Sequence, residues 1–357
     1  MSELEETRRA VQKRYGEATI KKGRNVVQPD RISTGIFTLD FALLGGMPMN
    51  RLSMVVGERH AGKSMISNLL IANAQRMYPD KVVVLLDIEG TFESTWAERL
   101  GVDLDALEIV ECDSGEMAVD VGDAMIGTED ASLVVADSIA AITPMKEQEA
   151  SAEDAFVGLQ ARLVGNFVRR MASSLVRERN RGHVVSVLFL NQFRSKIGGF
   201  AGFGEPRSIP GGKALEFATT IQMIIKNKEN KGKDAKGIDT ITHNEHAFTI
   251  TKNKLNGGPR TGEFIMTRSD DDATGLLAGM VDDSATLLSF AKKFGMYTGG
   301  GSAWKLEFEG YNLKFGKAAQ AIQALREDSD FYWDLRTEVI RAQAVSLGMT
   351  KEFIARI

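Results

Sequence analysis

The sequence predicts an α/β fold in which a mainly parallel, twisted sheet is flanked by helices. Two observations predict it: apolar runs of strand length recur along the chain, and helix-length segments separate most of them. Parallel neighbours need long crossover connections, and Ser64 to Tyr78 and Gly158 to Arg179 are suitable crossover helices. The strand-like runs are Leu52 to Val56, Val82 to Leu86, Leu133 to Ala136, Val184 to Leu190 and Ile221 to Ile225.

Before the first of these strands the chain has a different pattern. Leu4 to Ile20 places a few apolar residues among many charges, as in a short surface helix. The polar stretch Lys21 to Arg31 then separates this segment from the core. We therefore expect an N-terminal helix and linker over residues 1–31 and the α/β core over residues 32–268.

The pattern changes again after an acidic run at residues 270–272. Leu287 to Phe294 and Ala318 to Leu347 are helix-like, and a hairpin-like stretch, Trp304 to Phe315, lies between them. We expect a small α+β domain over residues 269–357. A chain of 357 residues is long enough for a large core with such attachments.

Composition narrows the class of protein. The chain is 43% hydrophobic and 26% charged, which is typical of a globular protein with a sizeable core. Its 44 basic and 48 acidic residues give a formal charge of -4, so any nucleic-acid site must be local.

The single cysteine, Cys112, excludes an internal disulfide framework and fits a reducing cytoplasm. Met1 to Lys22 has no apolar signal-peptide core, and no stretch reaches the roughly 20 apolar residues of a membrane span, so we expect no membrane partner.

A phosphate-binding loop is the strongest motif in the sequence. Residues 57–64 match G-x-x-x-x-G-K-[ST], directly after an apolar strand and before a helix. The glycines let backbone N–H groups face phosphate oxygens, and the helix N-terminus adds a positive dipole. Lys63 offers a charge to the terminal phosphates and Ser64 a hydroxyl to magnesium, whereas His60 is needed only for its backbone. The expected nucleotide-binding residues of this loop are Gly57, Glu58, Arg59, His60, Ala61, Gly62, Lys63 and Ser64.

Three other strands end in polar side chains. Asp137 follows an apolar strand and is expected to hold magnesium through a water. Asp87 and Glu89 share one side of another strand, and one of them can orient the attacking water. Glu89 is nearer the expected mouth of the sheet, and the alternative role of Asp87 is to cap the following turn. Gln192 ends a fourth strand, where an uncharged amide can sense a terminal phosphate.

Two segments lack a regular pattern. Asn191 to Lys213 is rich in glycine, and a loop of this length inside a compact domain is typically functional. Lys226 to Gly237 is rich in charges and is expected to be a solvated turn between two strands rather than a binding patch.

Taken together and in this order, these motifs resemble the RecA family of recombinases, bacterial and phage-encoded, over nearly the whole chain. Further stretches of the sequence also resemble this family, and a generic ATPase would not share all of them. The resemblance implies a RecA-type P-loop core that binds ATP and Mg²⁺. It also implies a DNA-dependent ATPase that forms helical homo-oligomeric filaments on single-stranded DNA and exchanges strands with duplex DNA in recombination and repair. The additional stretches are Ile32 to Gly35, Leu39 to Asp40, Gly45 to Pro48, Leu100 to Asp103, Asp137 to Pro144, Asn191 to Arg194 and Gly211 to Phe217.

The resemblance implies residue roles that spacing alone does not show. Glu89 matches the family's catalytic glutamate, Gln192 its phosphate-sensing glutamine, and Trp96 its aromatic residue against adenine. Lys252 and Lys254 match a pair that reaches the ATP of a neighbouring subunit, and the N-terminal helix matches the arm that packs on the next protomer. Without the family, Trp96 would be a core residue and the two lysines an exposed strand end.

Two segments match the family's DNA-binding loops, residues 147–162 and 193–212. In such loops basic groups follow phosphates and apolar side chains separate bases, as in sequence-tolerant single-strand binding. Because Gln192 opens the second loop, ATP binding and DNA binding would influence each other. The implied DNA-binding residues are Arg162, Arg194, Lys196, Phe203, Arg207, Gly211 and Gly212.

Some features depart from the bacterial pattern. They are the phosphate-loop interior, Glu58 to Ala61, the first-loop segment Ser151 to Phe156, and a final segment, Lys351 to Ile357, that is not acidic. These departures leave open the origin of the chain, tail-based self-restraint and repressor cleavage in the SOS response. Single-strand-binding and loader proteins are candidate partners, and the expected location is the cytoplasm of a bacterial or phage-infected cell.

Two other functions stay open at this point. A RecA-fold ring motor such as a helicase would form closed rings instead of helical filaments, and electron microscopy would separate the two. An ATP-gated DNA-binding scaffold would lack hydrolysis, and phosphate release with and without single-stranded DNA would identify it.

Overall fold

The computed structural model describes residues 2–23, 28–149, 158–195, 207–233, 239–270 and 275–357. The chain forms two compact units. Unit 1 contains residues 1–30, 48–225 and 250–255, and unit 2 contains residues 31–47, 226–249 and 256–357. The domain boundaries expected after residues 31 and 268 stay predictions.

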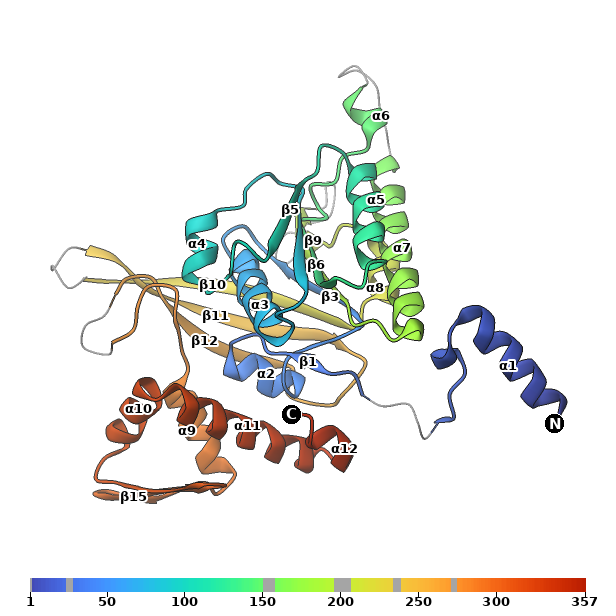
Figure 1. Ribbon diagram of the computed structural model, residues 1–357. Coiled ribbons are helices and arrows are strands. Elements are labelled where there is room, and N and C mark those ends of the chain that lie inside the picture. Colours follow the sequence, from blue (N-terminus) through green and yellow to red (C-terminus); the bar gives the residue numbers. More distant parts are fainter. Residues whose placement is uncertain (1, 24–27, 150–157, 196–206, 234–238, 271–274) are drawn as a thin grey trace. The chain divides into compact units, whose positions relative to one another are not determined.

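A parallel sheet forms the centre of unit 1 (Figure 1). The strands are hydrogen-bonded in the order β10-β3-β7-β6-β4-β5, with every neighbouring pair parallel, so the expected α/β class is confirmed. The register aligns Gly57 with Gln192 and Asp87 with Asp137, which brings the carboxyl ends of four strands to one edge. The strands are β3 (Leu52–Gly57), β4 (Val82–Asp87), β5 (Leu107–Glu111), β6 (Ala131–Asp137), β7 (Ser186–Gln192) and β10 (Ile221–Lys233), which belongs to unit 1 up to Ile225.

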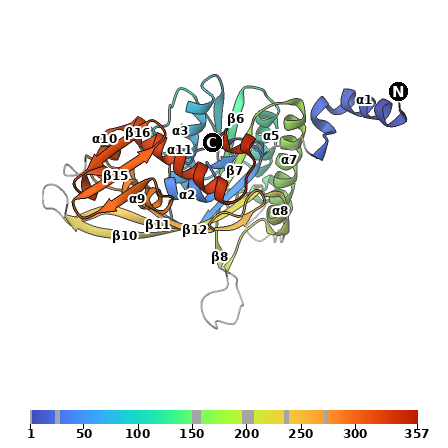
Figure 2. The ribbon, with the colours of Figure 1, turned by 90° about the horizontal axis from the view of Figure 1, so that it is seen from below.

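Helices cover both faces of this sheet (Figures 1 and 2). Helix α3 (Lys63–Met77) lies on one face, and α5 (Gly115–Ile126) packs beside α7 (Leu159–Arg181) on the other. Alternate strand residues such as Met54 and Phe189 share a buried apolar cluster with α5 and α7, because side chains alternate across a strand. Strand β7 is buried on both faces from Ser186 to Asn191, which explains why this segment is a nearly continuous apolar run in the sequence.

Short elements complete unit 1. Helix α1 (Glu3–Tyr15) begins at a Ser2–Glu5 capping box and ends before Gly16, which has a φ of 104°. A β-carbon at Gly16 would lie 2.7 Å from the carbonyl oxygen of Asn180, so the turn there requires glycine. The remaining elements are η1 (Glu17–Thr19), α4 (Ser94–Arg99), α6 (Met145–Gln148), β8 (Arg194–Ser195), β9 (Arg207–Ser208) and α8 (Gly212–Ala218).

Unit 2 contains antiparallel strands and a group of helices. Strand β11 (Asp239–Asn253), whose last residues belong to unit 1, pairs with β12, and β12 pairs with β13. A separate three-stranded sheet has the order β14-β15-β16. Phe37 and Phe41 of α2 are buried with Leu287 and Leu335 in one apolar cluster. The other elements are β1 (Arg31–Ile32), α2 (Phe37–Leu43), β2 (Met47–Pro48), β12 (Thr261–Thr267), β13 (Val281–Asp282), α9 (Ser284–Lys293), β14 (Tyr297–Gly300), β15 (Ala303–Phe308), β16 (Tyr311–Phe315), α10 (Ala318–Glu327), α11 (Ser329–Ser346) and α12 (Lys351–Ile354).

A buried charge cluster connects α2 and α11 within unit 2. The Asp40 carboxylate is fully buried and pairs with the Arg336 guanidinium, and it also accepts from the Thr34 hydroxyl at 2.6 Å. Nearby, Asp283 accepts from the Phe37 amide at 2.7 Å and from the Tyr332 hydroxyl. Burial raises the pKa of the Asp283 carboxyl to about 6.

Two expectations about secondary structure are wrong. Residues 226–233 of the expected solvated turn, Lys226 to Gly237, continue strand β10 to Lys233, because pairing with the neighbouring strand β11 outweighs their charge. Residues 234–237 of that segment lie outside the described residues. The single helix expected from Ala318 to Leu347 is two helices, because the Asp328 carboxylate accepts from the Phe331 amide and starts α11 anew. Within the described residues, no helix is both long and apolar enough to span a lipid bilayer.

Candidate active site

The phosphate-binding loop connects β3 to α3. Gly62 adopts a φ of 100° directly before the helix, and His60 has a φ of 59° within the loop. A β-carbon at Gly57 would lie 2.8 Å from that of Ala61 and 2.9 Å from the carbonyl oxygen of Ile225, so only glycine fits there. The sequence therefore folds this segment as a tight loop at a helix N-terminus, which is an anion-binding geometry.

Lys63 lies folded over this loop. Its ammonium donates to the carbonyl oxygens of Glu58 at 2.7 Å and Gly57 at 3.3 Å, and the side chain is buried. Burial lowers the pKa of the Lys63 ammonium from its usual value, although three nearby carboxylates oppose the shift. A lysine held in this position offers a positive charge to an anion bound in the loop.

Ser64 and Asp137 form the second part of the site. The Ser64 hydroxyl donates to Asp137 Oδ2 at 3.0 Å. Burial raises the pKa of the Asp137 carboxyl to about 6, and the Ser64 hydrogen bond opposes this shift. One hydroxyl and one carboxylate are hard oxygen donors of the kind that Mg²⁺ prefers when phosphates and waters complete its shell. The described residues contain no group of three or more His, Cys, Asp or Glu side chains that could hold a metal ion alone.

Glu89 is held by two donors at the same edge of the sheet. The Gln192 side-chain amide donates to Glu89 Oε1 at 2.7 Å, and the Ser138 hydroxyl donates to the same oxygen atom. Gln192 comes from the end of β7 and Ser138 follows β6, so three strand ends meet at this carboxylate. No role of Ser138 could be predicted from the sequence, because its contact with Glu89 depends on how the chain turns after Asp137.

Asp87 has a different role. Its two carboxylate oxygens accept from the backbone amides of Thr91 at 3.2 Å and Phe92 at 3.0 Å. The expected turn-capping alternative for Asp87 is therefore confirmed. Glu89, by contrast, lines the cavity described next.

A cavity of about 1130 Å³ brings most of these groups together. It lies at the carboxyl ends of the parallel strands, where ligands of open α/β sheets bind. Glycine-loop, carboxylate and amide residues from four strand ends share its wall, so it can hold a phosphorylated ligand beside Glu89. Its lining residues are Glu58, Arg59, His60, Lys63, Ser64, Glu89, Thr91, Asp137, Ala140, Ala141, Gln192 and Phe193.

The lining does not include Gly57, Ala61 and Gly62 of the phosphate loop, nor the expected site residues Trp96, Lys252 and Lys254. Trp96 is in the first turn of α4, where its amide donates to the Glu93 carboxylate at 2.6 Å. Lys254 donates from its ammonium to the Phe217 carbonyl oxygen at 2.8 Å, and Lys252 donates to that of Glu216. The ammonium groups of the two lysines thus contact the last turn of α8, where the carbonyl ends of a helix favour cations. Burial and the neighbouring Lys254 charge lower the pKa of Lys252.

The expected DNA-binding residues fall on several elements. Arg162 is exposed in the first turn of α7. Arg194 pairs with Ser208, and Ser195 with Arg207, in the β8–β9 ribbon. Gly211 and Gly212, with φ angles of 96° and 55°, begin α8. The expected residues Lys196 and Phe203 lie outside the described residues.

Asn191 has a structural role that the sequence did not predict. It is fully buried, and its amide donates to the Pro210 carbonyl oxygen at 3.0 Å. This bond joins the two ends of the second candidate DNA loop directly beside Gln192. The Asn-Gln pair at the strand end indicated a polar contact at this position, but the hydrogen-bond partner of Asn191, the Pro210 carbonyl oxygen, is set by the fold.

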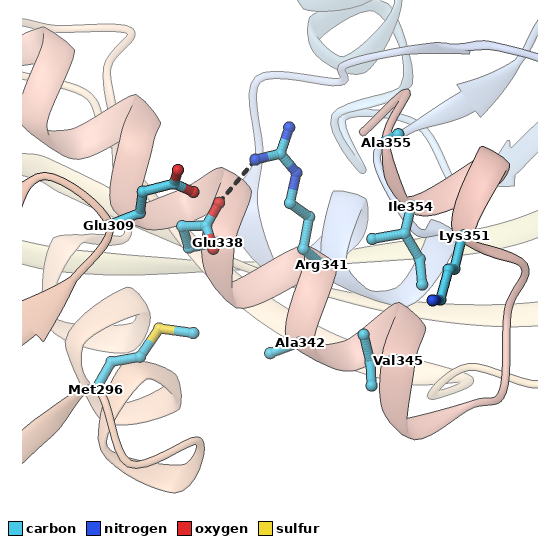
Figure 3. Close-up of a pocket in the computed structure, with 9 residues that line it drawn as sticks. All are labelled: Met296, Glu309, Glu338, Arg341, Ala342, Val345, Lys351, Ile354 and Ala355. Atoms are coloured by element: carbon cyan, nitrogen blue, oxygen red, sulfur yellow. Dashed lines mark hydrogen bonds and ion pairs between the residues drawn. The ribbon is translucent and has the colours of Figure 1, made fainter.

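A second cavity, of about 630 Å³, lies within unit 2 (Figure 3). Helix α11 supplies an ion pair to its wall, with Arg341 and Glu338 2.7 Å apart, and apolar side chains such as Val345 and Ile354 supply much of the rest. Its nine lining residues include no phosphate-loop segment and no Asp, so the chemistry expected from the sequence belongs to the first cavity.

Comparisons with known proteins agree with this geometry. Residues 2–269 match the family model described as RecA N-terminal domain. A curated relative named Protein RecA from Chlorobium limicola is 31% identical over 335 residues, covering 92% of this chain and 88% of the relative. Those from Clostridium perfringens strain 13 and Nocardia farcinica are 32% and 31% identical, covering 96% and 97% of this chain and 91% and 94% of the relatives.

Proposed function

The chain belongs to the RecA family, and from this premise we propose that it is a DNA-dependent ATPase that acts in recombination and repair. It forms helical filaments on single-stranded DNA and exchanges strands with a homologous duplex. The observation that supports the proposal most is one cavity that combines the phosphate loop, the Ser64–Asp137 pair and the Glu89–Gln192 pair.

In the proposed reaction, the loop from Gly57 to Ser64 binds the phosphates of ATP. Its backbone amides and the Lys63 ammonium face the phosphate oxygens, while Ser64 and Asp137 would hold Mg²⁺. Bound magnesium would neutralise charge on the phosphate oxygens. Trp96, in the first turn of α4, would lie against the adenine ring.

Glu89 orients the attacking water in this proposal. The donors Ser138 and Gln192 converge on Oε1, and this fixes the carboxylate so that Oε2 can accept from a water facing the terminal phosphate. Phosphoryl transfer depends mainly on positioning and charge stabilisation, so one fixed carboxylate is sufficient for this role.

DNA acts on this site through the second loop. Gln192 joins Glu89 to that loop, and Asn191 ties the loop's far end to the same strand. A terminal phosphate that competes for the Gln192 amide changes the start of the loop, and DNA bound to the loop changes Gln192 in return. The DNA contacts proposed for this loop come from Arg194, Lys196, Phe203, Arg207, Gly211 and Gly212, and Arg162 is the contact proposed for the first loop.

Neighbouring subunits complete the active site. Lys252 and Lys254 would reach the ATP of the next protomer, where a charge supplied in trans can raise the rate by roughly 10³ to 10⁵. Helix α1 has no buried residue in this chain, which supports its proposed role as the arm that packs on the next protomer. A repeated head-to-tail contact of this kind builds an open helix.

A strand-exchange assay tests the proposal directly. The full chain is mixed with single-stranded DNA and with matched or unmatched duplex, in ATP and in a slowly hydrolysed analogue, and the assemblies are imaged by electron microscopy. We expect helical filaments and exchange with the matched duplex alone. Closed rings, or a chain that stays monomeric with ATP, magnesium and an oligonucleotide present, would contradict the proposal.

A further inference from the structure

We propose that Gln160 is a positioning residue that connects the start of α7 to Glu89 by a route separate from Gln192. The connection runs through the segment from Ser138 to Ile142. The inference rests on the proposed function, and it assigns a specific coupling role to a residue outside the cavity lining.

The first step is the contact that Gln160 makes. Its side-chain amide nitrogen donates to the carbonyl oxygen of Ile142 at 2.7 Å and to that of Ala140 at 3.2 Å. Gln160 is the second residue of α7, and Arg162, the candidate DNA contact, is two residues further along the same first turn. A movement of this turn on DNA binding would therefore be transmitted to the two carbonyl groups.

The second step is the segment itself. Ala140 and Ala141 line the nucleotide cavity, and the buried Ile139 amide donates to the Leu190 carbonyl oxygen at 3.0 Å. A turn in which the Ala141 amide donates to the Ser138 carbonyl oxygen at 3.0 Å closes the segment. These bonds make Ser138 to Ile142 one short, closely packed unit that cannot shift at one end alone.

The third step is the contact between this segment and Glu89. The Ser138 side chain is fully buried, and its hydroxyl donates to Glu89 Oε1, the atom that also accepts from Gln192. Glu89 thus receives one donor from the strand that opens the second loop and one from the segment held by Gln160. DNA on the first loop and DNA on the second loop would both act on one carboxylate.

A purely structural role for Gln160 predicts a different outcome. An amide that only satisfies two carbonyl groups would change the stability of the fold when removed, and it would leave the response to DNA unchanged. The decisive quantity is therefore the ratio of kcat with DNA to kcat without DNA, measured together with KM for ATP and with the melting temperature.

The experiment uses the full chain, a poly-dT oligonucleotide and steady-state phosphate release over a range of ATP concentrations. We expect Gln160→Ala to lower the kcat ratio by at least about fivefold, the factor corresponding to one ordinary hydrogen bond, with KM for ATP unchanged. Gln160→Glu keeps the size of the side chain but cannot donate, so it should lower the ratio as well. Gln75→Ala is the matched control, because the Gln75 amide also donates to a backbone carbonyl oxygen, that of Asp103 at 2.7 Å, outside both candidate DNA loops and outside the cavity lining.

A double-mutant cycle tests the route. If Gln160 acts through Ser138, then Ser138→Ala combined with Gln160→Ala should lower the ratio no further than Ser138→Ala alone. Independent, multiplicative losses would overturn the route. An unchanged ratio in Gln160→Ala, or an equal loss in Gln75→Ala, would overturn the coupling role. Failure of the proposed function is distinguishable, because the unmodified chain would then show no DNA-stimulated hydrolysis at all.

Discussion

Replacing Glu89 with glutamine isolates the chemical role of one carboxylate. Both donors at this position, the Ser138 hydroxyl and the Gln192 amide, bind the Oε1 atom. Glutamine has nearly the same shape, and its Oε1 can accept from both donors, so Glu89→Gln preserves the geometry and removes only the charge. A positioned group that accepts a proton from water contributes about 10² to 10⁴ in rate. We therefore expect kcat to fall by that factor while ATP binding and filaments persist.

The comparison with Asp87→Asn makes this prediction specific. Asp87 uses one oxygen for the Thr91 amide and the other for the Phe92 amide, and asparagine can accept only one of these bonds. The loss of one ordinary hydrogen bond at the turn corresponds to about fivefold in rate. Phosphate release with single-stranded DNA and nucleotide binding by fluorescence would be measured for both variants. A Glu89→Gln protein with unchanged turnover, beside an Asp87→Asn protein that is inactive, would refute the assignment and transfer the role to Asp87.

Three further predictions concern the fold around the site. Arg336→Ala should lower the free energy of unfolding by about 3 kcal/mol in urea, because it leaves the buried Asp40 carboxylate without its cation; a loss below about 1 kcal/mol would contradict the buried pair. Asp283→Asn should flatten the pH dependence of unfolding. Because burial raises the pKa of Asp283 to about 6, its stabilising contribution is complete below about pH 4 and is lost as pH rises through 6; equal changes in urea midpoint between pH 5 and pH 7 for both proteins would refute this. Gly57→Ala should abolish ATP binding measured by calorimetry, since its β-carbon would lie within 3 Å of two neighbours, and unchanged binding would contradict the loop geometry.

Sequence patterns were sufficient for the elements whose signals are local. The phosphate loop needs a strand, glycines at fixed positions and a helix, and all three are neighbours in the sequence. The apolar runs that became β3, β4, β6 and β7 were recognisable because strands buried on both faces are apolar throughout. Local capping could also have shown the break at Asp328, since an aspartate three residues before Phe331 is a typical helix start.

Contacts that depend on distant segments could not be predicted. Arg336 lies in a helix that carries other charged residues, such as the exposed Asp330 and Asp334, and its pairing with Asp40, 296 positions earlier, explains its burial. Ser138, Gln160 and Asn191 bond to partners whose positions are set by how the chain turns after each strand. The strand from Lys226 to Lys233 was hidden for a related reason: its charges suggested a turn, and its strand conformation comes from pairing.

Phosphate release by the full chain, measured with saturating ATP and magnesium and with or without single-stranded DNA, shows whether DNA controls the nucleotide cavity. We expect DNA to raise kcat by more than about tenfold and Lys63→Ala to remove hydrolysis under both conditions. Equal rates with and without DNA, or sustained hydrolysis by Lys63→Ala, would contradict a nucleotide cavity coupled to DNA.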